Sequence, residues 1–240
     1  MITGKSVLRQ AGFVLLALFS AGAVAAGAGT VTHLSRTLSV QRADGSVRIL
    51  SQKSEVNAGD VLTTQRDSYA QINFSDGSSI TMRPNTQVKV EQFNFVQDRP
   101  QEDSSFLRLV KGGLRTVTGL VGKRGNLDAY KIGTNTATIG IRGSSGDTID
   151  NTGAGCEGVT AGCEKLPQGV FHTTYTGSYI MQNEGGAQVI GEGQFGFASY
   201  PKLPPILLPG DPGLNLSQLP FVLGVGSGRI QGPGQECIVR

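Results

Sequence analysis

The chain has 240 residues, of which 38% are hydrophobic, 16% are charged and 6% are aromatic, and it contains 35 glycines and no tryptophan. Such a glycine content excludes a coiled coil or helical bundle, and the lack of a three-residue glycine period excludes collagen. A single long apolar run excludes a protein with many membrane spans, and a net charge of +3 is too small to indicate a nucleic-acid partner. The length predicts one domain, with or without an appendage.

The first 25 residues have the features of a secretory signal peptide. Lys5 and Arg9 supply positive charge, residues 11–19 are apolar, and small residues end in Ala25, as a signal peptidase requires. We therefore predict cleavage after Ala25, a periplasmic location and no membrane span in the mature protein, and we leave open secretion or association with the envelope. The alternative is an uncleaved anchor.

From residue 38 onward, apolar residues recur at every second position, which is the period of a half-buried strand. Asp44-Gly45 and Asp76-Gly77 are dipeptides typical of hairpin turns, and each is followed by a serine and a new alternating run. No window of a dozen residues shows helical spacing. The sequence therefore predicts an all-β fold, with strands within residues 38–41, 70–75, 80–82, 88–90, 93–95, 106–111, 130–132 and 137–141.

The second half of the chain has weaker strand signals. Residues 143–167 are rich in Gly, Thr, Asn and Asp, and we expect a long loop there. We expect a hairpin around Thr176-Gly177, and a pair of short strands between residues 189 and 198. Six prolines between residues 201 and 220 predict an extended segment that cannot join the centre of a sheet.

Five motifs in the middle of the chain carry a family resemblance. They are AGDVLTT at 58–64, AQINFSDGS at 70–78, ITMRPNT at 80–86, LVKGGLR at 109–115 and TATIGIRGS at 136–144. In this order and spacing they resemble the FecR-like periplasmic domain over about residues 56–147. The resemblance implies an all-β fold of stacked short strands, which form a β-roll or a short β-helix.

The resemblance also implies a division of the chain and a class of function. We expect a signal peptide over 1–25, the FecR-like domain over 26–147, a glycine-rich disulfide loop with a β-hairpin extension over 148–200, and a Pro/Gly-rich tail over 201–240. The best-known members of the family relay the occupancy of an outer-membrane iron-siderophore receptor through a transmembrane helix and a cytoplasmic anti-sigma segment. We expect this chain to resemble the secreted, stand-alone members instead.

The residues that would carry catalysis are scarce. The histidines are His33 and His172, there is no Gly-x-Ser-x-Gly motif, and the cysteines and histidines lack the spacing of a zinc site. We therefore expect no catalytic residues, no metal and no cofactor. Some relatives resemble self-cleaving proteins, and Gly133-Thr134 and Gly143-Ser144 supply the atoms for such a reaction here.

Three cysteines bear on the compartment. Cys156 and Cys163 lie close together in the glycine-rich segment, and in an oxidising compartment we predict that they form a disulfide that fixes a surface loop. Cys237 is left over, and it is either free or links two chains.

Positively charged side chains gather between residues 106 and 131, after an acidic segment over residues 91–103. If they share a face, they would attract an anionic polysaccharide, lipid head groups or an acidic protein patch. The alternative is a solvated sheet edge. Arg142 either pairs with a carboxylate such as Asp147 or faces an acid of a ligand, and we favour the pair. The candidate binding residues are Arg108, Lys111, Arg115, Lys123, Arg124 and Arg142.

Two functions fit these observations. The first is a non-catalytic binding, signalling or scaffold module whose partner is an envelope protein, contacted through an exposed sheet edge or the proline-rich tail. The second is a structural protein of the envelope that binds anionic glycan through residues 106–131. A self-cleaving regulator is a distant third. We expect no nucleic-acid partner.

Overall fold

A computed structural model describes residues 27–126, 128–153, 155–214, 216 and 219. The predicted signal peptide with its cleavage site after Ala25, the end of the tail and Cys237 lie outside these residues. Within them the chain forms 15 β-strands and two short 3-10 helices, and none of those helices has the length and hydropathy to cross a bilayer. The predicted all-β fold is confirmed.

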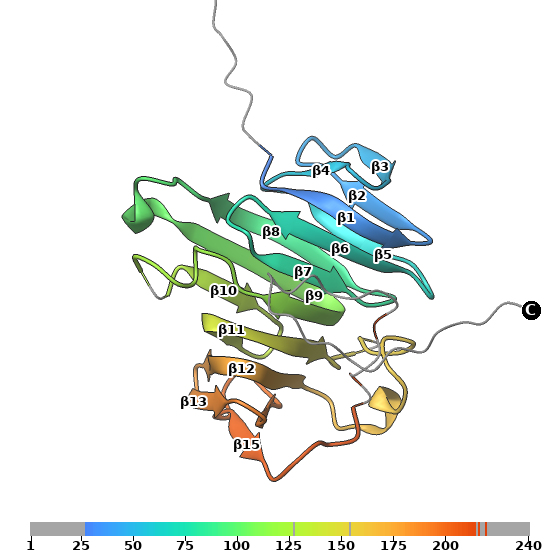
Figure 1. Cartoon of the computed structure of the whole chain (residues 1–240). Helices are drawn as coiled ribbons and strands as arrows, with labels where there is room; N and C mark the ends of the chain where they lie inside the picture. Colours follow the sequence, from blue (N-terminus) through green and yellow to red (C-terminus); the bar gives the residue numbers. More distant parts are fainter. Residues whose placement is uncertain (1–26, 127, 154, 215, 217–218, 220–240) are drawn as a thin grey trace, which may run out of the picture.

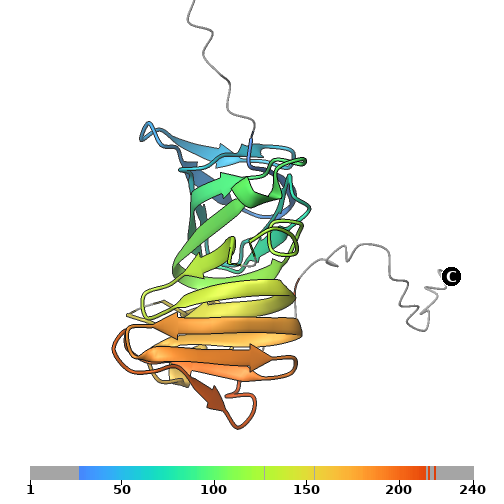
Figure 2. The same ribbon diagram turned by 90° about the vertical axis from the view of Figure 1, so that its left-hand side faces the viewer.

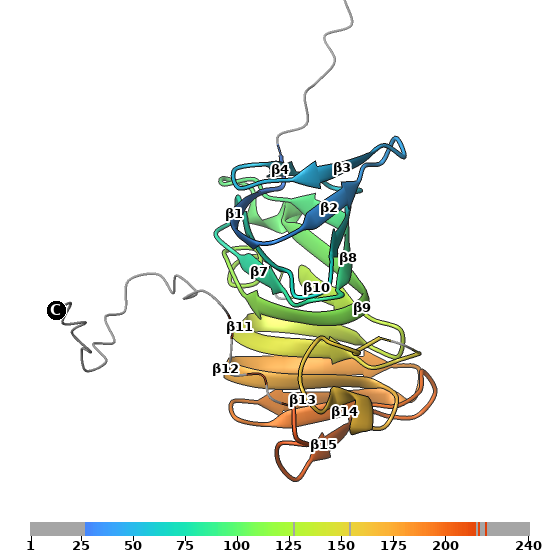
Figure 3. The same cartoon turned by 90° about the vertical axis from the view of Figure 1, so that its right-hand side faces the viewer.

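The first nine strands form a roll. One branch of the sheet runs β3-β2-β5-β8-β9 and the other runs β4-β1-β6-β7-β9, so that β9 joins the two branches. Figure 3 looks along this roll, with its strands around a common interior. The bounds are β1 Gly29–Ser35, β2 Leu38–Gln41, β3 Val47–Leu50, β4 Glu55–Val56, β5 Val61–Thr64, β6 Tyr69–Phe74, β7 Ser79–Met82, β8 Gln87–Asn94 and β9 Ser104–Val117.

The alternating residues fill this roll as the sequence predicts. Ala70, Ile72 and Ile80 are fully buried, and they belong to one main core with the apolar residues of β2, β5, β8 and β9. The two predicted hairpins are also present, since Asp44-Gly45 joins β2 to β3 and Asp76-Gly77 joins β6 to β7. In each turn the aspartate accepts a hydrogen bond of 2.9 Å from the backbone N–H two residues later, which fixes the turn.

β9 bends where it changes partner. Its first half pairs with β8 and its second half with β7. Between them Gly112 has φ +93°, and a Cβ there would lie 2.4 Å from Thr86 Oγ1. Only glycine fits such a position. The strand predicted within residues 106–111 is longer than expected, because it continues through Gly112 to Val117.

The remaining strands extend the sheet below the roll. From β9 the order is β10, β11, β12, β14 and β15, with β13 paired to β12 (Figure 1). Figure 2 shows these strands stacked side by side. Their bounds are β10 Tyr130–Gly133, β11 Thr138–Asp150, β12 Val170–Asn183, β13 Gly186–Gly191, β14 Phe195–Ala198 and β15 Ile206–Leu208. The 3-10 helices are η1 Pro100–Glu102 and η2 Cys163–Lys165.

Two expectations for this region were wrong. Residues 143–150 are not a loop but the second half of β11, which pairs with both β9 and β12. Their small side chains serve close approach, because a Cβ at Gly146 would lie 2.4 Å from the carbonyl oxygen of Thr173. Residues 170–182 are not a hairpin around Thr176-Gly177, since β12 runs through both and turns after Asn183.

The proline-rich segment contributes an edge strand. β15 pairs with β14 at the end of the sheet, and Pro209 stops it directly after Leu208. This position agrees with the expectation that the segment cannot join the centre of a sheet, because proline is tolerated at an edge.

Candidate functional site

Two rows of cross-strand neighbours lie on the face of the sheet that is turned away from the main core. Antiparallel pairing places the members of each row side by side across β7, β9, β11, β12, β14 and β15. The first, which we call the charged row, contains Thr81, Arg115, Asp147, Thr173, Phe195 and Leu208. The second, the apolar row, contains Gly113, Ile149, Phe171, Phe197 and Ile206.

Four residues on this face form an arginine–aspartate centre, which consists of Arg83, Arg115, Asp147 and Tyr175. Asp147 is completely buried, and its carboxylate accepts hydrogen bonds from Arg83 Nη2 at 2.9 Å and from Arg115 Nε and Nη2 at 2.8 Å each. The hydroxyl of Tyr175 donates to the same carboxylate at 2.8 Å, and its ring lies 4.7 Å from the guanidinium carbon of Arg115. The aspartate is thus saturated with donors.

The position of Arg83 depends on Gly113. The Arg83 side chain, which is 1% exposed, passes over β9, and a Cβ at Gly113 would lie 2.8 Å from its Cδ. Glycine at this position therefore makes room for a second guanidinium group beside Asp147.

The environment of the centre fixes its charges. Burial alone would raise the pKa of Asp147, but hydrogen bonds from Arg115 and the charges of Arg83 and Arg115 outweigh it and hold that pKa below its ordinary value. Burial, together with the charge of Asp147, raises the pKa of the Tyr175 hydroxyl. The centre therefore contains two cations, one anion and a neutral phenol at neutral pH.

A later part of the chain covers this centre. We call residues 209–214 and 216 the strap. The carbonyl oxygen of Leu216 accepts hydrogen bonds from Arg83 Nη2 at 2.7 Å and from Arg115 Nη2 at 2.8 Å. The side chains of Leu214 and Leu216 are 4% and 5% exposed, and they pack in a second core against the apolar row.

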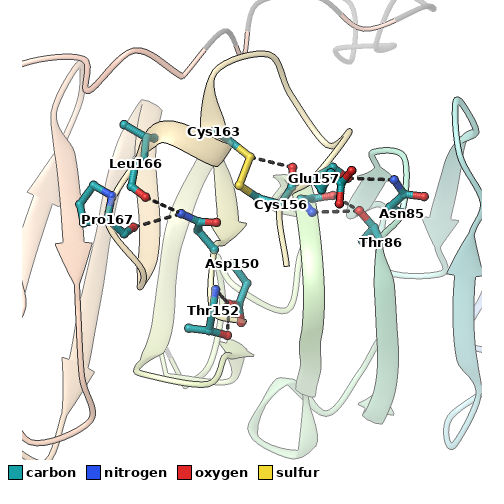
Figure 4. Close-up of a disulfide and its surroundings, with 11 residues drawn as sticks. Asn85, Thr86, Asp150, Thr152, Cys156, Glu157, Cys163, Leu166 and Pro167 are labelled. Carbon is teal, nitrogen blue, oxygen red and sulfur yellow. Dashed lines mark hydrogen bonds between the residues drawn. A yellow bond between two sulfur atoms is a disulfide. The ribbon is translucent and has the colours of Figure 1, made fainter. Parts of the chain in front are cut away.

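The disulfide loop, residues 151–169 without 154, forms the other side of that core. Cys156 and Cys163 are disulfide-bonded and buried, as the sequence predicts for the pair (Figure 4). Asn85 Nδ2 donates to the carbonyl oxygen of Glu157 at 2.9 Å, and Asn151 Nδ2 donates to that of Leu166 at 3.0 Å. The first bond attaches the loop to the turn between β7 and β8, and the second joins the two ends of the loop to each other.

A pocket of about 420 Å³ lies beside the strap. One wall comes from the sheet and the other from the strap. It is lined by Thr173, Tyr175, Phe195, Asp211, Gly213, Leu214 and Leu216.

The predicted basic residues have separate structural partners. Arg108 Nε donates to Glu91 at 2.6 Å, and Arg124 Nε donates to Asp103 at 2.9 Å. Arg115 belongs to the centre described above. Two of the six basic side chains of segment 106–131 thus pair with the acidic segment 91–103. Lys111 and Lys123 are exposed.

The expected pairing of Arg142 with Asp147 is wrong. Both lie on β11, but a β-bulge interrupts the strand between Arg142 and Gly146, and each residue has other partners. Arg142 is half exposed, with its Nη2 4.0 Å from an oxygen of Asp128. Asp147 pairs with Arg83 and Arg115 instead.

The residues considered for catalysis are occupied in the fold. The Thr148 hydroxyl and His172 Nδ1 are 3.0 Å apart, but both residues are buried, and burial lowers the pKa of His172 to about 3. The hydroxyls of Thr134 and Ser144 donate to the carbonyl oxygens of Ala137 and Ser178. Within the described residues no group of three His, Cys, Asp or Glu side chains is placed to hold a metal ion.

Sequence reasoning missed Arg83, Tyr175 and the strap as parts of a site. The signal for Arg83 was a single charged residue directly after the apolar strand that ends at Met82. No comparable signal marked the strap, because its two leucines stand among prolines and glycines without a period.

The chain was compared with known proteins, and the matches cover parts of it. No curated protein matches it. Two crystal structures of a proposed anti-sigma factor from Parabacteroides distasonis are similar, each with a TM-score of 0.45 and 9% identity over 63% of this chain, which spans 60% of that protein. A cell surface anchoring domain is similar with a TM-score of 0.26 and 23% identity, over 27% of this chain and 84% of that one. Residues 60–161 match the model of the family described as FecR protein, and this part of the chain is a FecR domain.

Proposed function

We propose that this protein is a non-catalytic module of the cell envelope that acts by binding another protein. FecR domains are associated with signalling and regulation at the envelope, which supports the general class. The observation that carries the proposal is the strap, because the outer face of the sheet already holds a segment of polypeptide that is not one of its strands. The side chains of Leu214 and Leu216 pack against the apolar row, and two arginines of the sheet bind the carbonyl oxygen of Leu216.

Several features support the location and organisation within this proposal. The disulfide favours an oxidising compartment, which agrees with a periplasmic protein released by cleavage after Ala25. We retain the division into a FecR-like domain, an extension from residue 148 and a tail from residue 201. β11 runs across residues 147 and 148, so the first two parts share one sheet.

The chemistry of the described residues favours binding over catalysis. A hydrolase of the serine or threonine type needs a hydroxyl and a base that a substrate can reach. The Thr148 and His172 pair is inside the protein, and a histidine with a pKa of about 3 is a poor base at neutral pH.

Glycan binding is the weaker alternative. Attraction to an anionic polysaccharide requires a surface with uncompensated positive charge. Arg108, Arg115 and Arg124 each pair with a carboxylate, which leaves the lysines of the segment as its exposed cations within the described chain.

Position-specific crosslinking in cells tests the proposal. A photo-reactive phenylalanine analogue would replace Phe195, which lines the pocket, and in a control chain it would replace Gln52, an exposed residue between β3 and β4. We expect one reproducible protein adduct at Phe195 that is missing at Gln52. Absence of a protein adduct at Phe195 would overturn the proposal, and retention on anionic polysaccharide that is lost at modest salt would then favour the glycan function.

A further inference from the structure

The strap is attached to the sheet in a way that differs from the rest of the fold. Beyond β15, no backbone group of the described strap residues pairs with a strand, and the backbone N–H of Leu216 donates within the strap to the carbonyl oxygen of Leu214. Asp211 accepts hydrogen bonds from the next backbone N–H groups and so forms a local turn. The strap is therefore held by two leucine side chains and one carbonyl oxygen.

The anchor of the strap has a charge that the strap does not match. Arg83 and Arg115 share one carboxylate, that of Asp147, so these three groups have a net charge of +1 in a mostly buried position. Besides the carboxylate of Asp147, both guanidinium groups bind the carbonyl oxygen of Leu216, which is neutral. In addition, the buried Arg83 Nε has no hydrogen-bond partner among the described residues. A carboxylate in place of this carbonyl would balance the charge and make stronger, charge-assisted hydrogen bonds.

The space around the anchor allows a larger occupant than the strap. The 420 Å³ pocket adjoins Leu214 and Leu216 and extends between Tyr175 and Phe195. The disulfide loop borders the strap on the far side, where the carbonyl oxygen of Gly213 would lie 3.3 Å from a Cβ at Gly162. A peptide that takes the place of the strap would find a formed socket for two apolar side chains, a cationic anchor and room for one more side chain.

We propose that the strap is a displaceable internal ligand, and that its groove binds an extended segment of a partner protein. This segment has two apolar side chains at positions i and i+2 and a carboxylate that binds Arg83 and Arg115. The inference rests on the proposed function and names the chemistry of its partner. The strap then competes with the partner, and binding requires that the strap leaves the groove.

A synthetic version of the strap tests this directly. The peptide PGDPGLNL, which has the sequence of residues 209–216, places its C-terminal carboxylate where the Leu216 carbonyl lies, and its C-terminal amide is the matched neutral probe. Both carry an N-terminal fluorophore, and binding is measured by fluorescence anisotropy. Binding is compared between the unmodified chain and a double variant, Leu214→Ser with Leu216→Ser. The strap of this variant lacks the two leucine side chains that pack against the apolar row.

We expect the acid to bind the variant at least tenfold more tightly than the amide does, and at least tenfold more tightly than it binds the unmodified chain. As a control, Arg108→Gln is added to this double variant. Arg108 lies outside the groove, so the triple variant should keep the tenfold preference for the acid over the amide. Equal binding of acid and amide, or no binding to the variant, would overturn the inference.

Hydrogen exchange of the unmodified chain gives a second measurement that does not depend on a variant. A saturating concentration of the acid should increase exchange in residues 206–216 and leave the disulfide loop unchanged. Unchanged exchange in residues 206–216 at saturation would also overturn the inference. If the peptides fail while a protein adduct forms at Phe195, the proposed function stands and the ligand chemistry is wrong.

Discussion

Replacement of Asp147 by asparagine tests whether the arginine–aspartate centre holds the two halves of the outer face together. The asparagine side chain would have nearly the same shape, but the change removes the one negative charge between Arg83 and Arg115. The carboxylate accepts four hydrogen bonds from Arg83, Arg115 and Tyr175, all between 2.8 and 2.9 Å. The substitution therefore leaves two guanidinium groups near each other without a counter-charge.

The size of the effect follows from burial. Removal of one partner of a buried ion pair costs about 3–5 kcal/mol, and Asp147 and Arg83 are almost completely buried. A domain of this size loses about 2–4 °C in melting temperature for each kcal/mol. We therefore expect a decrease of about 6–20 °C. The matched control is Glu91→Gln, which breaks the partly exposed pair with Arg108 and should cost less than about 1 kcal/mol.

The pH dependence gives an independent check. The pKa of Asp147 is lowered in the folded state, so its contribution to stability is present above the unfolded value of 3.8 and is lost as the pH falls through the folded value. The difference between wild type and Asp147→Asn, measured by urea unfolding, should be constant near neutral pH and decrease below pH 3.8. A difference no larger than that of Glu91→Gln, or one that grows as the pH falls, would refute the reasoning.

Three further predictions concern the same fold. The pKa of His172 is lowered to about 3 by burial, so the unfolded chain binds a proton below pH 6.5 that the folded chain does not. Between pH 6 and 5 the unfolding free energy of wild type should therefore fall by about 1.2 kcal/mol more than that of His172→Gln, and equal slopes would contradict this. Replacing Cys156 and Cys163 by serine should cost about 2.5 kcal/mol in urea unfolding under oxidising conditions, and the difference should vanish in reductant. Gly112→Ala should destabilise the chain by at least about 2 kcal/mol, and by clearly more than Gly45→Ala. Both glycines have positive φ, but only a side chain at Gly112 would collide with Thr86. Similar losses in the two variants would show that the packing of Thr86 against β9 is not decisive.

The parts of the fold that the sequence predicts well are those with local causes. The hairpin at Asp76-Gly77 depends on hydrogen bonds within three residues, and the alternation of Ala70 and Ile72 depends on one buried face. The disulfide is also local, since its cysteines are seven positions apart. In each case the physical reason and the sequence signal are contained in the same short window.

The predictions that were wrong concern residues whose structure depends on distant parts of the chain. Residues 143–150 have the composition of a loop, yet they are a central strand because β9 and β12 approach them closely on both sides. The glycine at position 146 allows β12 to approach closely and does not form a turn. Arg142 and Asp147 are neighbours in the sequence, but a β-bulge on β11 lies between them, and the arginine partners of Asp147 are 64 and 32 positions away.

The candidate site is a composite, and this has a consequence for how the protein is divided. The matched segment 60–161 supplies Arg83, Arg115 and Asp147, whereas Tyr175 and the strap come from the chain after it. A fragment that ended at residue 161 would expose Asp147 and the apolar side chain of Ile149, because β12 and the strap would be missing. The three charged residues of the centre therefore lie within the segment that matches the FecR model, whereas Tyr175 and the groove beside it come from residues 170–214 and 216.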